Sequence, residues 1–185
     1  METYFLDWLE LVLRWLHVIT GIAWIGASFY FVWLDNSLEE PPRWKIDSGV
    51  KGELWAVHGG GIYEVGKYRL GPAKLPETLH WFKWEAYGTW VSGIALMSLV
   101  YYGSASFYMI DFEILDINEI QAISISLFGI GLGWACYDGL CRSPIGRNDL
   151  WLAVFGFLFL VALAYSCGEI FSARGAFMQM GITIG

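Results

Sequence analysis

A histidine followed by three glycines is the first feature of this sequence that is suited to chemistry. Residues 54–69 read "LWAVHGGGIYEVGKYR", and the glycines after His58 are Gly59, Gly60 and Gly61. Glycine allows a sharp turn and close approach of the backbone to a ligand, and histidine exchanges protons near neutral pH. Lys67, Arg69 and several aromatic rings follow. This pattern predicts a site for a planar anion, stacked on one side and held at its edge by charge-assisted hydrogen bonds.

The second feature is a histidine inside an apolar segment. His17 falls within residues 15–34, "WLHVITGIAWIGASFYFVWL", and shares a helical face with Glu10 and Arg14 through spacings of three and four. Because an unmet polar group in hydrocarbon costs on the order of several kcal/mol, His17 requires a partner. Two interpretations stay open: a hydrogen bond to a facing helix, or axial ligation of a haem iron.

His80 and Glu85 form a third, weaker feature, at the start of another apolar run. Either residue could relay a proton, and either could simply mark the membrane interface. The three cysteines form neither a haem-attachment motif nor a convincing zinc-binding spacing. No phosphate-binding loop is present.

The composition is that of an integral membrane protein. The 185 residues suit one domain, and 56% of them are hydrophobic, with a mean hydropathy of +0.48. The net charge of −7 argues against a nucleic-acid partner, because phosphate binding requires a basic face. We therefore treat residues 1–185 as one integral membrane domain in contact with lipid.

Four apolar runs reach or approach the roughly 20 residues that a bilayer core requires, and none alternates like a membrane β-strand. They cover residues 15–34, 84–103, 120–137 and 150–168. A fifth run, residues 175–185, is shorter, and we expect the sequence to be a fragment of a longer chain. The predicted fold class is all-α: a polytopic transmembrane helix bundle with at least four spans plus a truncated fifth.

The basic residues predict the orientation of this bundle. Lysine and arginine are concentrated in residues 35–83 and missing from residues 104–119, which carry four acidic side chains. Connections rich in lysine and arginine stay in the cytoplasm. We therefore expect a cytoplasmic loop at residues 35–83, with the N-terminus and residues 104–119 outside. Lys67 and Arg69 could also be present only because they follow this rule, without binding an anion.

Three stretches carry a resemblance to a known family: "LHVITGIAWIGASFYFVWLDNSL", "VHGGGIYEVGKYRL" and "LPETLHWFKWEAYGTW". They resemble the N-terminal membrane domain of the bacterial membrane-bound urate hydroxylases, urate oxidases that carry a C-terminal cytochrome c domain. The resemblance implies an enzyme of purine catabolism in the bacterial inner membrane. It oxidises urate to 5-hydroxyisourate and passes electrons to a cytochrome c and on to a terminal oxidase. The haem c would belong to a fused domain absent from this sequence.

The resemblance also suggests roles for the selected residues. We expect His58 and the backbone of Gly59, Gly60 and Gly61 to orient or deprotonate urate, and Lys67 or Arg69 to hold its charge. His80 or Glu85 would relay a proton. The first apolar segment is similar, more loosely, to small haem-binding membrane oxidases in which a first-helix histidine ligates haem b, which favours His17 as a haem ligand.

Two other functions remain open. A non-catalytic haem b electron-transfer subunit of the membrane would need His17 but not the glycine-rich loop. A transporter or purely structural membrane protein would need neither.

Overall fold

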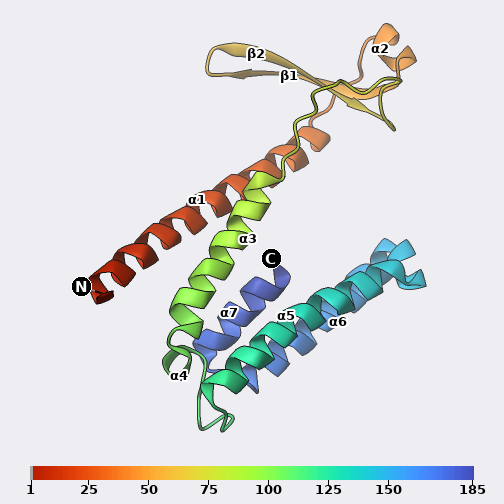
Figure 1. Cartoon of the computed structure of the whole chain (residues 1–185). Coiled ribbons are helices and arrows are strands. Elements are labelled where there is room, and N and C mark those ends of the chain that lie inside the picture. The colour runs from red at the N-terminus through yellow and green to blue at the C-terminus, as the bar shows by residue number, and fades with distance from the viewer. Residues whose placement is uncertain (1) are drawn as a thin grey trace. The chain divides into compact units, whose positions relative to one another are not determined.

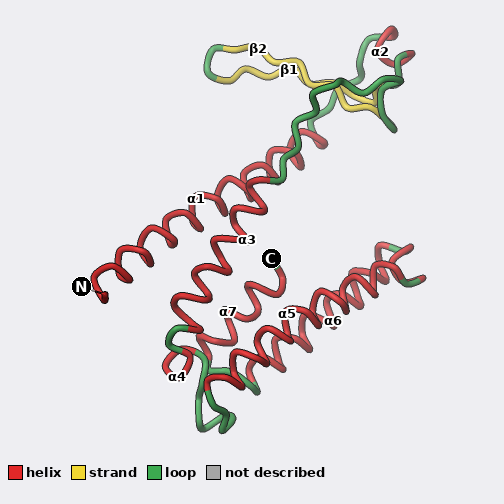
Figure 2. The backbone as a smooth tube through the Cα atoms, viewed as in Figure 1, coloured by secondary structure: helices red, strands yellow, loops and turns green. Residues whose placement is uncertain are grey.

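A computed structural model describes residues 2–185, with side chains from residue 4 onward, and shows a mainly helical chain with one β-hairpin (Figures 1 and 2). In chain order the elements are α1 (Glu2–Asn36), α2 (Arg43–Asp47), β1 (Val50–His58), β2 (Gly61–Tyr68), α3 (Trp84–Leu96), the π-helix η1 (Met97–Tyr102), α4 (Ala105–Tyr108), α5 (Glu119–Arg142), the 3-10 helix η2 (Pro144–Arg147), α6 (Asp149–Gly168) and α7 (Ala173–Ile184). The chain divides into two compact units. We call Met1–Val18 with Gly88–Gly185 the bundle unit, and Ile19–Tyr87 the hairpin unit.

Three helices are long and apolar enough to cross a membrane: Tyr4–Asn36 within α1, then α5 and α6. The 35 residues of α1 extend about 52 Å at 1.5 Å per residue, well beyond a hydrocarbon core of about 30 Å. The predicted span at residues 84–103 is helical, but it is divided between the 13 residues of α3 and the six of η1. The 12 residues of α7 are too few for a full span. The prediction of at least four spans therefore stays a prediction.

Side-chain caps define where the helices of the bundle unit begin. Asn118 and Gln121 form a reciprocal capping box at the start of α5, in which each side chain bonds the other residue's backbone N–H. The Asn148 side chain accepts from two backbone N–H groups at the start of α6. These caps satisfy backbone donors that the first helical turn leaves without partners.

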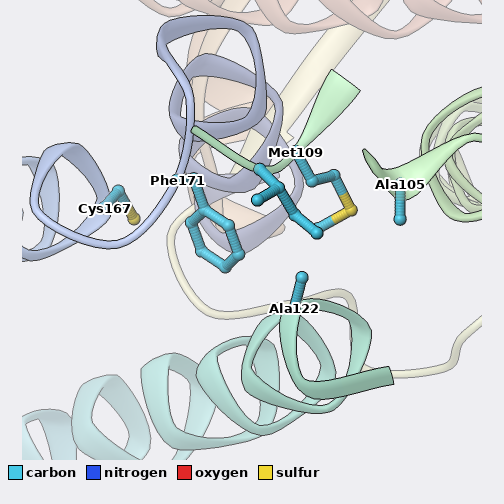
Figure 3. Close-up of a cluster of buried hydrophobic side chains, with 6 residues drawn as sticks. Ala105, Met109, Ala122, Cys167 and Phe171 are labelled. Carbon is cyan, nitrogen blue, oxygen red and sulfur yellow. The ribbon is translucent and has the colours of Figure 1, made fainter. Parts of the chain in front are cut away.

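The helices of the bundle unit meet at a small apolar core (Figure 3). Its buried members are Ala105, Met109, Ile110, Ala122, Cys167 and Phe171. They come from α4, α5, the end of α6 and the segments next to them, so the core joins the ends of these helices. The Ser172 hydroxyl donates to the Tyr108 carbonyl at 2.6 Å and fixes the start of α7 beside this core. In this unit α5 and α6 run side by side (Figure 1).

The hairpin unit corrects the prediction of an all-helical chain. Strands β1 and β2 pair antiparallel in a two-stranded sheet (Figure 2), and Glu39 adds an isolated bridge to Glu53. Residues 35–83 were expected to be a loop. The alternation of apolar and polar residues in these strands is a hairpin signal, but it is weak because both faces also carry charged groups.

Candidate functional site

The glycines after His58 form the turn of the hairpin. His58 pairs with Gly61, and the two residues between them have positive φ, +57° at Gly59 and +80° at Gly60. A two-residue turn with positive φ at both positions matches the twist of the strands and strongly favours glycine. A Cβ at Gly61 would lie 2.8 Å from the Tyr63 hydroxyl oxygen. The backbone and the Tyr63 ring therefore explain all three glycines without a ligand.

The hairpin presents His58, Tyr63 and Lys67 on one face. The ladder pairs His58 with Gly61, Ala56 with Tyr63 and Gly52 with Lys67, and directly paired residues point to the same side of a sheet. His58 and Tyr63 are exposed at the tip. Lys67 lies six residues beyond Gly61, about 20 Å along the strand. The structure thus places His58 and Lys67 on one face without bringing them together.

The two cations proposed to hold an anion differ in their surroundings. The Lys67 ammonium donates to the Asp35 carboxylate at the end of α1 at 2.5 Å, and both side chains are about half exposed. Arg69 is exposed, and its backbone N–H bonds the Gly49 carbonyl. Within residues 2–185 no carboxylate pairs with the Arg69 guanidinium. Arg69 is therefore the better placed of the two to bind an anion.

A second ion-pair group lies on the opposite face of the hairpin. The Lys45 ammonium donates to the carboxylates of Glu53 on β1 and Glu64 on β2, and it lies 5.2 Å from the centre of the Trp44 ring. Hydrogen bonds to Glu53 and then Glu64 raise the pKa of Lys45 above its usual 10.5. Lys45 therefore ties α2 to both strands.

His80 lies between the hairpin and α3, and Glu85 lies at the start of α3. The His80 ring meets Phe82 edge to face at a centroid distance of 4.8 Å, and Phe82 meets Phe31 of α1 in the same way at 5.0 Å. Glu85 stands in the first turn of α3, where a carboxylate interacts favourably with the helix dipole. The aromatic contacts place His80 beside α1 rather than at the tip of the hairpin with His58.

In the bundle unit, His17 bonds to α3. Its ring nitrogen Nδ1 lies 3.1 Å from the Thr89 carbonyl oxygen and 3.1 Å from the Ser92 hydroxyl oxygen. The ring also lies against Gly93, where a Cβ would approach the His17 Cε1 atom to 3.1 Å. His17 therefore has the partner on a facing helix that its apolar setting requires.

A cavity of about 680 Å³ lies in the bundle unit. Its wall includes Trp90 of α3, Gly133 and Trp134 of α5, Gly156 of α6 and Ile182 of α7. No charged side chain lines it within the described residues, and its size is typical of a small-molecule site. It could take a flat apolar ring, but it offers no cation for the propionates of a haem.

The bundle unit also contains a buried network of polar side chains that the sequence analysis did not predict. The Ser126 hydroxyl donates to the Gln179 side-chain oxygen at 2.5 Å and lies 2.8 Å from the Tyr102 hydroxyl. The Gln179 amide nitrogen donates to the Ser126 carbonyl at 3.0 Å. The network links η1, α5 and α7. A glutamine within an apolar run, as in residues 175–185, was the available signal, since such groups bond neighbouring helices.

Comparison with known proteins identifies the family. The family described as "Urate oxidase N-terminal" matches residues 3–185. Comparisons with curated proteins and with solved structures found no match. The family match includes His17, the whole hairpin and the segment with His80 and Glu85. The chain therefore belongs to the urate oxidase N-terminal family.

Proposed function

We propose that this chain is the membrane part of a urate hydroxylase that oxidises urate to 5-hydroxyisourate and passes electrons to a cytochrome c. The observation that carries the proposal is the family match over residues 3–185. The reaction adds water to urate and releases two protons and two electrons. Two one-electron haem groups of cytochrome c would accept these electrons for each urate, and a terminal oxidase would reoxidise them.

The hairpin unit supplies the groups that suit urate. Urate is planar and largely a monoanion at neutral pH, so it needs an aromatic or apolar surface and a cation at its edge. His58 and Tyr63 lie exposed on one face of the hairpin tip, and Arg69 carries a guanidinium with no ion pair in the described chain. We assign to His58 the role of accepting a proton from urate, and to Arg69 the role of binding its negative charge. Lys67 could bind this charge instead, once urate replaces Asp35 as its partner. His80 or Glu85 would relay the proton onward.

The bundle unit supplies a candidate haem ligand. A metal-bound histidine usually donates its other ring N–H to a carbonyl or carboxylate, and the contact of His17 Nδ1 with the Thr89 carbonyl has this form. His17 would hold haem b, which when bound supplies one-electron transfer. Among residues 2–185 no cluster of three or more metal-ligating side chains occurs, and a haem requires only axial ligands from the protein.

A non-catalytic haem b electron-transfer subunit is the second candidate function. It is favoured by the structural role of Gly59 and Gly60, whose positive φ angles form a turn that needs no substrate. Such a subunit would use His17 and would not bind urate.

Equilibrium dialysis of urate against the purified chain in detergent distinguishes these functions. Arg69→Ala should weaken urate binding about tenfold or more, because a charge-assisted hydrogen bond contributes roughly 1.5–3 kcal/mol. Arg43→Ala removes another exposed cation of the hairpin unit and serves as the matched control. Absence of urate binding in a chain whose visible spectrum shows bound haem would instead support the electron-transfer subunit.

A further inference from the structure

One side of the hairpin tip is apolar and exposed. Val57 pairs directly with Ile62, and Trp55 lies two residues before Val57 on the same strand, so the three side chains point to one side of the sheet. Trp55 is 61% exposed, Val57 74% and Ile62 73%. We call these three residues the tip face. His58 and Tyr63 point to the other side of the hairpin.

The charged side chains of the hairpin lie outside the tip. Residues 55–63 contain no aspartate, glutamate, lysine or arginine. The carboxylates on the same side as the tip face, Glu53 and Glu64, lie nearer to the base of the hairpin, and both accept hydrogen bonds from Lys45. An exposed apolar surface that has polar groups only at its border is typical of an interaction site.

The base of the hairpin is fixed at the end of the apolar part of α1. The apolar run of residues 15–34 is followed by Asp35, and a helix of roughly 20 residues extends about 30 Å, the thickness of a hydrocarbon core. The Lys67 ammonium donates to the Asp35 carboxylate at 2.5 Å, and Glu39 forms a β-bridge with Glu53. These two contacts hold both strands at the level where α1 would leave the hydrocarbon.

The tip face has the composition and the position to meet lipid. Ile62 lies five residues from Lys67, about 17 Å along the strand, so a hairpin that lies along the surface keeps its tip beside the bilayer. Amphipathic elements lie in this way, with their apolar face turned into the membrane. Tryptophan favours the boundary between headgroups and hydrocarbon, and valine and isoleucine favour the hydrocarbon itself.

We infer that the tip face contacts the boundary between the headgroups and the hydrocarbon of the bilayer and holds the hairpin against the membrane, with His58 and Tyr63 turned to water. The inference rests on the proposed crossing of the membrane by α1 and is independent of urate binding. Because the contact is apolar, it requires no anionic lipid. A bilayer of phosphatidylcholine alone should therefore support the contact as well as one that contains phosphatidylglycerol.

Spin labels report which side of the hairpin meets lipid. The chain, with its three cysteines replaced by serine, is reconstituted in phosphatidylcholine nanodiscs and labelled at Val57→Cys, Ile62→Cys or Tyr63→Cys, one position at a time. Power saturation compares collisions with oxygen, which concentrates in hydrocarbon, and with a water-soluble nickel chelate. The labels at Val57 and Ile62 should collide more with oxygen. The label at Tyr63, the matched control on the other side, should collide more with nickel.

Two reference labels separate this inference from the membrane crossing of α1. The label at Ile22→Cys, an exposed position of α1, should collide more with oxygen, and the label at Lys74→Cys more with nickel. If the Ile22 label collides more with nickel, the crossing of α1 and the inference are both wrong. If only the Val57 and Ile62 labels do so, or if a protein contact shields them from both reagents, the inference is wrong and the crossing of α1 stands.

The fluorescence of Trp55 repeats the test without a label. The chain has 11 tryptophans, and the difference in emission between wild type and Trp55→Phe isolates the signal of Trp55. Lipids brominated on the acyl chain near the headgroup should quench this signal, whereas acrylamide in the water should quench it weakly. Strong quenching by acrylamide and none by the brominated lipids would overturn the inference. Failure of the chain to bind urate would overturn the proposed function and leave these results unchanged.

Discussion

At the scale of single residues, buried polar side chains of this protein form hydrogen bonds with residues of other helices. The Ser126 hydroxyl, fully buried in α5, donates to Gln179 of α7 and contacts Tyr102 of η1. Each of these groups would otherwise face an apolar surrounding, where an unsatisfied polar atom is costly. The hydrogen bonds of Ser126 therefore stabilise the packing of three helical segments.

Ser126→Ala should lower the stability of the bundle unit by about 1–2 kcal/mol, because it removes one partner each from Gln179 and Tyr102. The measurement is unfolding of the purified chain in mixed detergent. Ser124→Ala, at an exposed position of the same helix, is the control and should change stability little. Equal effects of the two substitutions would contradict a stabilising role for the network.

Lys45 provides a prediction about pH. Its bonds to Glu53 and Glu64 raise its pKa in the folded hairpin above the usual 10.5. Because the pKa is higher in the folded state, these ion pairs contribute fully to stability below about pH 10.5, and the contribution is lost as pH rises through the folded-state pKa.

NMR titration of ¹³C-methylated lysines should show the Lys45 signal titrating above pH 10.5. Glu64→Gln should lower that pKa, whereas Glu77→Gln, at an exposed position of the same unit, should not. If the pKa of Lys45 is the same in Glu64→Gln and in the wild-type chain, the ion pair between Lys45 and Glu64 does not form in solution.

At the scale of elements, the hairpin depends on the backbone of its turn. Gly60 has a φ of +80°, which costs an L-residue roughly 1–2 kcal/mol, least for asparagine. A two-stranded sheet is only marginally stable, so Gly60→Val should largely abolish protection of the strand amides from hydrogen exchange. Gly60→Asn should retain much of it. Equal protection in both variants would contradict the turn geometry.

Part of these elements could be predicted from the sequence. The apolar runs predicted α1, α5 and α6 because lipid requires long apolar helices, and Asn118 and Asn148 are typical of helix starts. The hairpin was missed because four consecutive residues of β1, Leu54 to Val57, are apolar and interrupt the alternation. The partners of His17 lie 72 and 75 residues away along the chain. No periodicity in a single sequence places such distant residues together, so the partners of His17 could not be predicted. The triple glycine was interpreted as a ligand site because the hairpin that it closes was not recognised.

At the scale of the whole molecule, orientation in the membrane follows from the basic residues. Residues 35–83 should face the cytoplasm and residues 104–119 the outside. In a chain whose three cysteines are replaced by serine, an impermeant maleimide added to intact cells with an opened outer membrane should label Glu113→Cys. Lys74→Cys should react only after the inner membrane is permeabilised. Labelling with the opposite sidedness would reverse the proposed orientation.

The central claim concerns the destination of the electrons of urate. The proposal that His17 holds a haem predicts that the electrons pass through this haem rather than directly to oxygen. His17→Ala should then uncouple urate oxidation from cytochrome reduction, whereas His58→Ala should abolish urate oxidation itself.

The most direct test adds urate to membranes that contain the protein and ferric cytochrome c, with terminal oxidases inhibited. Urate loss, cytochrome reduction and hydrogen peroxide are measured together. The account predicts two cytochrome haems reduced for each urate consumed, with no stoichiometric peroxide. One peroxide formed per urate, while the cytochrome stays oxidised, would contradict it.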